Sequence, residues 1–209
     1  MSSTNRRGVT VKKLYWGLGD NTETGLDEAD NCTIETVNNH IYFYSAIDTQ
    51  SILNLVKTIR EATDKMVMDA RKVGFESPLI YLHINSPGGS VLDGFAAMDA
   101  ISTNEIPIVT IIDGVAASSG TFLTIVGKER WINKHAYMLI HQISSGYWGK
   151  YNENKDAMRN MDSLMQDLKY MYKEYTKLPN KKLEEILNHN LYFNADTCLK
   201  YGLVDKVLS

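Results

Sequence analysis

Two adjacent serines occupy a turn that could present a nucleophile. The segment at 114–120 reads Gly-Val-Ala-Ala-Ser-Ser-Gly and lies between a β-branched run at 107–112 and an apolar run at 119–126. These patterns predict a buried strand followed by a short buried helix. A serine at such a strand-to-helix turn has its hydroxyl lifted clear of the sheet, beside the free N–H groups at the start of the helix.

Ser118 fits this turn better than Ser119 does. The turn needs small residues two positions before and after the nucleophile, and Ser118 has Ala116 and Gly120 there, whereas Ser119 has Thr121 after it. The alternative is structural, because small residues around a buried serine also serve helix–sheet packing. The pattern by itself leaves both interpretations open.

A serine hydrolase also needs a histidine base, a group that orients this histidine, and N–H donors for the oxyanion. His141 is the best placed of the five histidines, because it lies at the far end of a predicted apolar strand. The others lie at strand starts, inside a strand or at the end of a polar helix: His40, His83, His135 and His189. The Gly88-Gly89 turn could present N–H groups, although Pro-Gly-Gly is also an ordinary tight turn.

Repeated strand–helix units are predicted to position these residues. Strands are expected at 40–44, 78–85 and 107–112, each followed by a helical pattern. Strands that alternate with helices favour a largely parallel α/β sheet, whose active groups collect at the carboxyl ends of the strands. The Gly- and Ser-rich turns at 86–90 and 114–120 are therefore expected to open on the same edge.

The second half predicts two more strands at 130–133 and 136–142, then helices and a final strand at 203–208. The longest helix carries apolar residues at three- and four-residue steps: Met158, Met161, Met165, Leu168, Tyr172 and Tyr175. This narrow seam suits a helix that lies on its own core, and it also suits one that packs against symmetry mates. Residues 1–38 are polar and acidic, so we expect an N-terminal arm or loops there and a single domain at 39–209.

The composition fits one α/β domain of 209 residues with 44% apolar content. A formal charge of −3 without a Lys/Arg block gives no electrostatic reason to expect nucleic acid. No segment approaches the roughly 18 apolar residues of a membrane span. The sequence therefore predicts a soluble, unexported, cytoplasmic protein. Cys32 and Cys198 lack metal-ligand spacing, and the residues imply neither a metal nor an organic cofactor.

Four segments together resemble the proteolytic subunit of the Clp protease, a serine peptidase family. They read Ile-Asn-Ser-Pro-Gly-Gly, the serine turn, Met-Leu-Ile-His-Gln and Tyr-Gly-Leu-Val-Asp, at 84–89, 114–120, 138–142 and 201–205. The resemblance runs from about residue 40 to the end of the chain. It implies a crotonase-like α/β spiral of repeated strand–helix units, with a protruding handle of a strand and a long helix at about 142–178.

The resemblance also implies roles for individual residues. Ser118 corresponds to the family nucleophile and His141 to its base, while the N–H groups of Gly89 and Ser119 correspond to its oxyanion hole. The substrate groove would be lined by Gly88, Ser90, Gln142, Ile143 and Gly146.

The third triad position departs from the family. An aspartate normally precedes a Phe-Leu-Ser-Ala-like segment, which is matched here at 192–195, and Asn190 stands in its place. An asparagine oxygen can accept the Nδ1–H of His141 but brings no negative charge, so impaired or gated activity is expected. The nearest carboxylates are Asp196, expected to cap a helix, and Asp205, expected at the surface.

The resemblance implies polypeptide substrates, a homo-oligomeric ring of seven subunits stacked in pairs, and an AAA+ unfoldase as a possible partner. The positions of the family's aromatic docking pocket include Tyr81 but also His83 and Thr103, and Ile143 replaces the usual proline after His-Gln. Docking of a standard ATPase is therefore not assumed. Neither a nucleic acid nor a membrane is expected as a partner.

Three functions follow from these observations. The first is a self-compartmentalised serine endopeptidase that acts through an acyl-enzyme. The second is a catalytically weak or silent ring subunit that shapes an assembly or binds a partner, which Asn190 and the altered docking positions motivate. The third is a crotonase-type acyl-CoA enzyme, which shares the spiral core and a two-N–H oxyanion hole. It ranks last, because it explains neither Ser118 nor His141.

Overall fold

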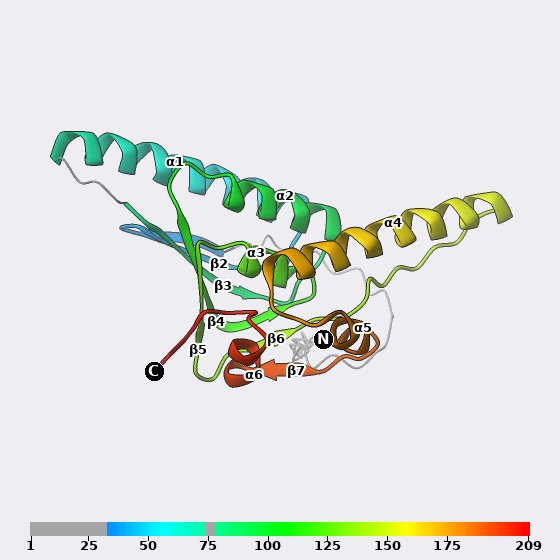
Figure 1. Ribbon diagram of the computed structural model, residues 1–209. Helices are drawn as coiled ribbons and strands as arrows, with labels where there is room; N and C mark the ends of the chain where they lie inside the picture. Colours follow the sequence, from blue (N-terminus) through cyan, green and yellow to red (C-terminus); the bar gives the residue numbers. More distant parts are fainter. Residues whose placement is uncertain (1–32, 74–77) are drawn as a thin grey trace, which may run out of the picture.

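An eight-stranded sheet organises the computed structural model, which describes residues 33–73 and 78–209 (Figure 1). Its strands are β1 (Thr33–Val37), β2 (His40–Tyr44), β3 (Ile80–Ser86), β4 (Ile108–Ala117), β5 (Glu129–Asn133), β6 (Tyr137–Leu139), β7 (Tyr192–Asn194) and β8 (Lys206–Leu208). The main path runs β1-β2-β3-β4-β5-β8, and β6 joins β4 to β7. The β1–β2 and β6–β7 pairs are antiparallel and the other pairs are parallel. The predicted mainly parallel α/β sheet is confirmed.

Six helices connect these strands in the described part of the chain. They are α1 (Thr49–Val73), α2 (Val91–Ser102), α3 (Gly120–Ile125), α4 (Tyr151–Tyr175), α5 (Asn180–Leu187) and α6 (Ala195–Lys200). Figure 1 shows α1 and α2 lying above the sheet, while one end of α4 projects well beyond the rest of the molecule. Within 33–73 and 78–209, no helix has the length and apolar character needed to cross a membrane.

Alternating side chains explain how the sheet is covered. In β3 the residues Ile80, Leu82 and Ile84 are fully buried in the core, whereas Tyr81 and His83 on the opposite face are only partly buried. A period of two places successive side chains on opposite faces of a strand. One face of the sheet therefore packs under helices, and the other carries polar and aromatic groups.

Residues 33–37 differ from the expectation of an arm or loops. They form β1, which pairs with β2 from Thr33 opposite Tyr44 to Val37 opposite His40. The short Thr-Ile-Glu-Thr-Val segment satisfies the backbone groups that an unpaired edge of β2 would expose. The rest of the expected arm, residues 1–32, lies outside the described residues.

The handle also differs from the expectation in one part. Its long helix is present as α4, but residues 140–150, where the strand of the handle is expected to begin, have no regular secondary structure. The strand expected before the handle at 136–142 is limited to 137–139. A strand needs a hydrogen-bonding partner, and in the described part of this single chain no strand pairs with 140–150. The expected strand of the handle is therefore absent from the isolated chain.

Candidate active site

Ser118 sits on a strained turn between β4 and α3. Its φ angle is +53°, in the left-handed region that costs a residue with a Cβ roughly 1–2 kcal/mol. Two neighbours hold this conformation: the Ser118 N–H donates to the Leu139 carbonyl oxygen at 2.8 Å, and the Ser118 carbonyl accepts from the Thr121 N–H at 3.0 Å. The bond to Leu139 fixes the turn against β6, two residues before His141.

The glycine turn after β3 lies directly against this serine. Gly88 has a φ of +89°, and a Cβ placed on it would lie 2.5 Å from the Ala117 carbonyl oxygen and 2.7 Å from the Cβ of Ser118. Only a residue without a side chain fits there. The two turns thus meet at one edge of the sheet, and that prediction is confirmed.

A cavity of about 40 Å³ lies beside Ser118. Its lining residues are Gly89, Val91, Ser118, Phe122, His141, Gln142, Ile143, Ser144, Leu168 and Tyr172. The structure therefore brings together the predicted nucleophile, the predicted base and one predicted oxyanion donor. It also places two of the predicted groove residues, Gln142 and Ile143, in the same wall.

Three other predicted groove residues lie outside this lining. Gly88 packs behind Ser118, and the Ser90 hydroxyl accepts the Asp93 N–H as the N-cap of α2. Gly146 lies in the exposed segment before α4 and has no described atom within 4 Å of a Cβ built on it. These three residues contribute to the shape of the turns and of the segment before α4, rather than to the wall of the cavity.

The predicted triad is not joined by hydrogen bonds. Within the described residues, no hydrogen bond links Ser118 to His141, or His141 to Asn190. The antiparallel β6–β7 pairing runs only from Leu139 opposite Tyr192 to Tyr137 opposite Asn194, so it does not reach His141 or Asn190. The next backbone hydrogen bond between these segments is from the Gln142 N–H to the Leu187 carbonyl oxygen, at 3.1 Å. Asn190 is exposed.

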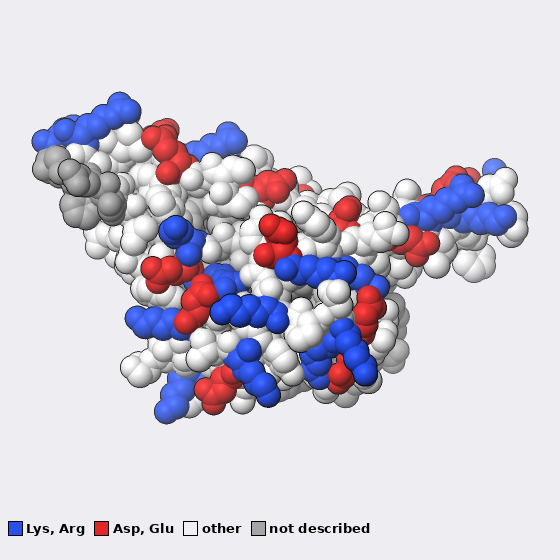
Figure 2. Space-filling model, viewed as in Figure 1, with Lys and Arg blue, Asp and Glu red and all other residues white. Residues whose placement is uncertain are grey.

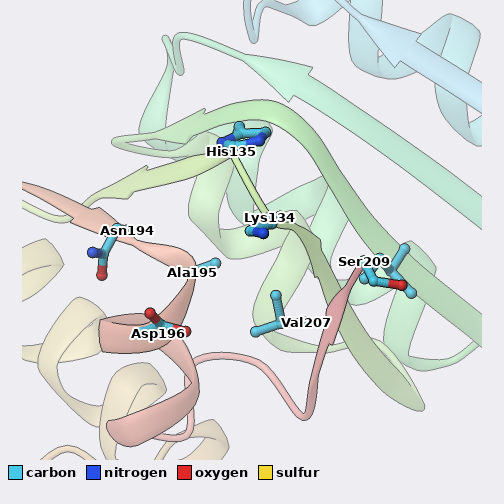
Figure 3. Close-up of a pocket in the computed structure, with 8 residues that line it drawn as sticks. Lys134, His135, Asn194, Ala195, Asp196, Val207 and Ser209 are labelled. Carbon is cyan, nitrogen blue, oxygen red and sulfur yellow. The ribbon is translucent and has the colours of Figure 1, made fainter.

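The two alternative carboxylates are placed elsewhere. The expectation that Asp196 caps a helix is wrong, because the Asn194 side chain accepts the Thr197 N–H at 3.0 Å and caps α6. Asp196 instead lines a separate cavity of about 340 Å³ with Lys134 and His135 (Figure 3).

Asp205 is tied to Arg130 rather than to His141. The Arg130 Nε–H donates to the Asp205 carboxylate at 2.9 Å, and the Arg130 backbone N–H donates to the same oxygen at 3.0 Å. The guanidinium hydrogen bonds lower the pKa of Asp205 below its ordinary value. Within 33–73 and 78–209, neither this carboxylate nor that of Asp196 forms a hydrogen bond with His141.

The two predicted oxyanion donors flank the meeting point of the turns. The Ser119 backbone nitrogen lies 3.2 Å from the position of a Cβ on Gly88, so Ser119 adjoins the Gly88-Gly89 turn. Within 33–73 and 78–209, neither the Gly89 N–H nor the Ser119 N–H donates to another backbone or side-chain group. The Ser119 hydroxyl is buried and also has no partner among the described residues.

The sequence did not predict that Tyr172 of α4 lines the cavity. Tyr172 was assigned only to the apolar seam, yet its hydroxyl lies 2.5 Å from the Thr121 Oγ1 inside the molecule. Thr121 follows Ser118 by one helical turn, and this spacing was the available signal. The partner on α4, 51 residues further on, could not be found from local pattern.

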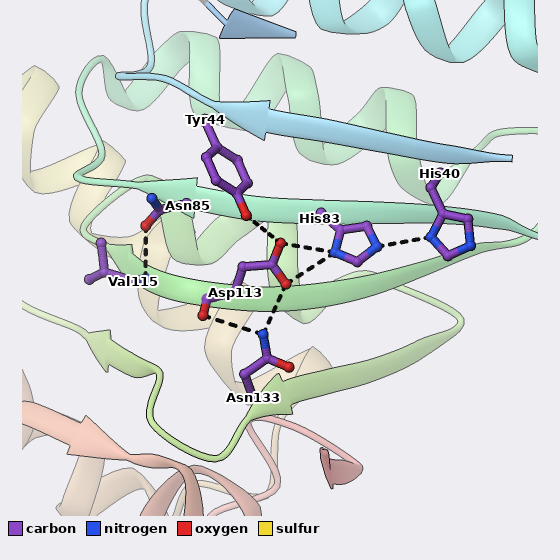
Figure 4. A network of polar contacts seen from close by, with 7 residues as sticks. All are labelled: His40, Tyr44, His83, Asn85, Asp113, Val115 and Asn133. Carbon is purple, nitrogen blue, oxygen red and sulfur yellow. Dashed lines mark hydrogen bonds and ion pairs between the residues drawn. The ribbon is translucent and has the colours of Figure 1, made fainter. Parts of the chain in front are cut away.

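A second polar cluster was also missed, on the open face of the sheet (Figure 4). Asp113 accepts hydrogen bonds from the Tyr44 hydroxyl at 2.6 Å and from His83 Nδ1 at 2.9 Å, and His83 Nε2 lies 2.9 Å from His40 Nδ1. Burial raises the pKa of Asp113, but hydrogen bonds from His83, Tyr44 and Asn133 outweigh burial and lower it below its ordinary value. Polar and aromatic residues at every second position of β2 and β3 were the signal.

Comparison with known proteins shows the family of this chain. The family model of the Clp protease matches residues 36–209. The chain belongs to the Clp protease family. It is also 30% identical over 180 residues to the ATP-dependent Clp protease proteolytic subunit 1 of Chlamydia caviae, with 73% of this chain and 94% of that protein covered. Membership in the Clp protease family makes this protein a peptidase, and the match begins within β1.

Proposed function

We propose that this protein is a serine endopeptidase with Ser118 as its nucleophile and His141 as its base. The observation that carries the proposal is a single small cavity lined by Ser118, His141 and Gly89. Ser118 stands on a strained strand-to-helix turn, which is how serine hydrolases expose a nucleophile. Family membership favours this reaction over that of an acyl-CoA enzyme.

The chemistry proceeds through an acyl-enzyme. The Ser118 oxygen bonds to the carbonyl carbon of the scissile peptide while its proton passes to His141. The Gly89 and Ser119 N–H groups stabilise the oxyanion that forms. The C–N bond then breaks and the leaving amine takes the proton from His141. Water attacks the ester with His141 as base, the acid product leaves, and the proton returns to Ser118.

A fluorophosphonate probe tests the nucleophile directly. We expect covalent labelling of the assembled wild-type protein, with mass spectrometry locating the adduct on Ser118. Ser118→Ala is expected to abolish labelling, while Ser119→Ala, which keeps the backbone N–H, retains it. An assembled protein that stays unlabelled, or an adduct located on Ser119, would contradict this assignment.

Asn190 motivates a second candidate function, a catalytically weak or silent subunit. Its amide is expected to hold the tautomer of His141 without stabilising the imidazolium by charge. Asn190→Asp supplies that charge at a position where the exposed side chain tolerates the change. Under the peptidase proposal, kcat for a peptide substrate rises by at least about tenfold, because loss of the aspartate from such a triad costs about 10⁴. Silence before and after the substitution would favour the weak or silent subunit.

We further propose that the chain works as a homo-oligomeric ring of seven subunits, stacked in pairs through α4 and the preceding segment. This assembly is taken from the family. It is supported here by the exposure of aromatic residues at the projecting end of the handle, Tyr147, Trp148 and Tyr151. Unfolded or small polypeptides would be the substrates, and a separate AAA+ unfoldase would supply larger ones if it docks.

A further inference from the structure

A relay of hydrogen bonds leads from α4 to the peptide that follows the proposed nucleophile. The Tyr172 hydroxyl lies 2.5 Å from Thr121 Oγ1, and this Oγ1 lies 2.6 Å from the Ser118 carbonyl oxygen. Tyr172 and Thr121 are both fully buried. The Thr121 N–H donates to the same carbonyl at 3.0 Å, so the Ser118 oxygen has two partners on one residue.

The direction of the relay follows from the groups involved. A carbonyl oxygen can only accept, so the hydroxyl proton of Thr121 points to Ser118. Thr121 has no second proton to offer, and Tyr172 must therefore donate to Thr121. Burial raises the pKa of the Tyr172 phenol, against the opposing hydrogen bond of Thr121, so the phenol keeps its proton at neutral pH.

The relay reaches the oxyanion site because a peptide unit is rigid. The described chain has no cis peptide bond, so the Ser118 carbonyl and the Ser119 N–H share one plane and point in opposite directions. Fixing the carbonyl fixes the N–H. Hydrogen bonds that end on the carbonyl also polarise the peptide and strengthen its N–H as a donor.

We propose that Thr121 and Tyr172 are positioning residues that hold the Ser118–Ser119 peptide with its N–H aimed at the oxyanion. The inference rests on the proposed function and adds the device that orients one of its two donors. Neither side chain has to touch the reacting atoms. Tyr172 belongs to α4, so the peptide is held only while this end of α4 stays packed against α3.

Two near-isosteric variants test the relay. Thr121→Val removes the hydroxyl, and Tyr172→Phe removes only the donor at the end of the relay. We expect Thr121→Val to lower kcat for a peptide substrate by about tenfold, less than the 10²–10³ of losing an oxyanion donor outright. Tyr172→Phe should lower it by about threefold, since the Thr121 hydroxyl still holds the carbonyl. KM stays within twofold in both, because the oxyanion exists only in the transition state.

Thr121→Ser is the conservative rescue, since it restores the hydroxyl without the methyl group. It should return kcat and the fluorophosphonate labelling rate to within twofold of wild type. Thr63→Val is the matched control, because Thr63 is another buried threonine that donates to a backbone carbonyl, that of Ile59 at 2.8 Å, on α1. It should lower the thermal midpoint without changing kcat.

The outcomes separate this inference from the proposed function. A wild-type protein that no phosphonate labels contradicts the proposed function itself. A labelled wild type with kcat unchanged in Thr121→Val and Tyr172→Phe overturns the relay alone. So does a Thr121→Ser variant that loses as much as Thr121→Val, because the methyl group would then be responsible. A rise in KM at constant kcat would likewise overturn the relay by assigning the pair to substrate binding.

Discussion

Backbone conformation at two adjacent turns decides the geometry around Ser118. Ser118 has a φ of +53° and Gly88 a φ of +89°, and Gly88 packs closely against the Ala117 carbonyl oxygen and the Cβ of Ser118. Such contacts leave no room for a Cβ on the glycine. The small residues of both turns therefore allow the two turns to approach each other closely, and this approach places Gly89 in the cavity beside Ser118.

Gly88→Ala tests this close approach. The new Cβ would lie 2.5 Å from the Ala117 carbonyl oxygen, in a backbone region that already disfavours alanine. We expect a loss of at least about 2 kcal/mol in the free energy of unfolding, from backbone strain and overpacking together. Urea denaturation measures it.

Gly146→Ala is the matched control for Gly88→Ala. Its Cβ would meet no described atom within 4 Å, and its φ is not positive. The free energy of unfolding should change by no more than about 0.5 kcal/mol. Equal losses in the two glycine variants would mean that close packing at the turn is not the cause.

At the scale of elements, the open face of β2, β3, β4 and β5 carries a connected polar network. His40 stacks on Tyr81 at 4.7 Å and His83 on Tyr42 at 4.4 Å, while the Asp113 carboxylate ties β4 to Tyr44 on β2. Parallel strands bring these groups into line because the registers of neighbouring strands are fixed. The protonation of one side chain in this network therefore affects the pKa of its neighbours on adjacent strands.

This network predicts a loss of stability in acid. Burial and the charge of His83 lower the pKa of His40 below 6.5, so the unfolded chain takes up a proton that the folded protein resists. The contribution of neutral His40 to the free energy of unfolding is complete above pH 6.5. It is lost as the pH falls from 6.5 toward the lowered pKa of His40. The pKa of Asp113 is lowered below 3.8, so its contribution to the free energy of unfolding is complete above pH 3.8. This contribution is lost as the pH falls below that value.

Denaturation by urea at pH 7.5 and pH 5.5 measures the histidine part. Wild type should be less stable at pH 5.5, and His40→Gln should show a smaller difference between the two pH values. His135→Gln is the control, since His135 is exposed and makes no side-chain hydrogen bond among the described residues. An unchanged pH dependence in His40→Gln would contradict the prediction.

Arg130 of β5 connects the end of α4 with the segment between α6 and β8. Its guanidinium donates to Asp205 before β8, to the Tyr175 carbonyl at 2.5 Å and to the Gly202 carbonyl at 2.9 Å. The side chain is 12% exposed, so these acceptors would lose their partner without full access to water. Hydrogen bonds to charged groups contribute more than neutral ones.

Arg130→Met should therefore lower the free energy of unfolding by about 2–4 kcal/mol, measured in urea at pH 7. Arg159→Met provides the comparison on α4. Arg159 is 78% exposed and, within the part of the chain that the structure describes, reaches only Asp156 at 3.5 Å, so its loss should change stability by no more than about 0.5 kcal/mol. If the Arg130 variant were as stable as the Arg159 variant, the hydrogen bonds of Arg130 would contribute little to stability.

At the scale of the whole molecule, α4 has two environments. Leu168 and Tyr172 are buried in the core, whereas Met158 is 57% exposed and Trp148, just before the helix, is fully exposed. Charges of both signs mingle on the projecting end (Figure 2). The apolar seam thus serves the core of this chain in one half of the helix and is left uncovered in the other. The prediction that the helix lies on its own core is confirmed for the half that carries Leu168 and Tyr172, and packing against symmetry mates stays a prediction for the other half.

The exposed residues at the projecting end of α4 and just before it predict which substitution disrupts ring pairing. Trp148→Glu places a charge where the proposed contact between stacked rings needs an apolar group, so the particle mass should fall to about half. Trp148→Phe, which keeps an aromatic side chain, should retain the double ring. Light scattering after gel filtration measures the mass. Both variants should unfold at the wild-type temperature, because the side chain is fully exposed. A double ring with Trp148→Glu would exclude this contact.

The sequence by itself determined the alternating strand and helix units, the serine turn and the short strand that leads to His141. These are local features, written in the spacing of apolar residues and in small residues at turns. Its expectations were wrong at 33–37 and at 140–150, where pairing with another strand, or the lack of it, decides the structure.

Only the tertiary structure decided which groups meet around Ser118. Tyr172 reaches Thr121 across 51 positions, Gly88 fits against Ala117, and Asp205 pairs with Arg130. No local pattern encodes such contacts, because they depend on how sheet register and helix packing bring distant segments together. The physical reason is that a turn is specified by its own residues, whereas the surroundings of its peptide groups are specified by the whole fold.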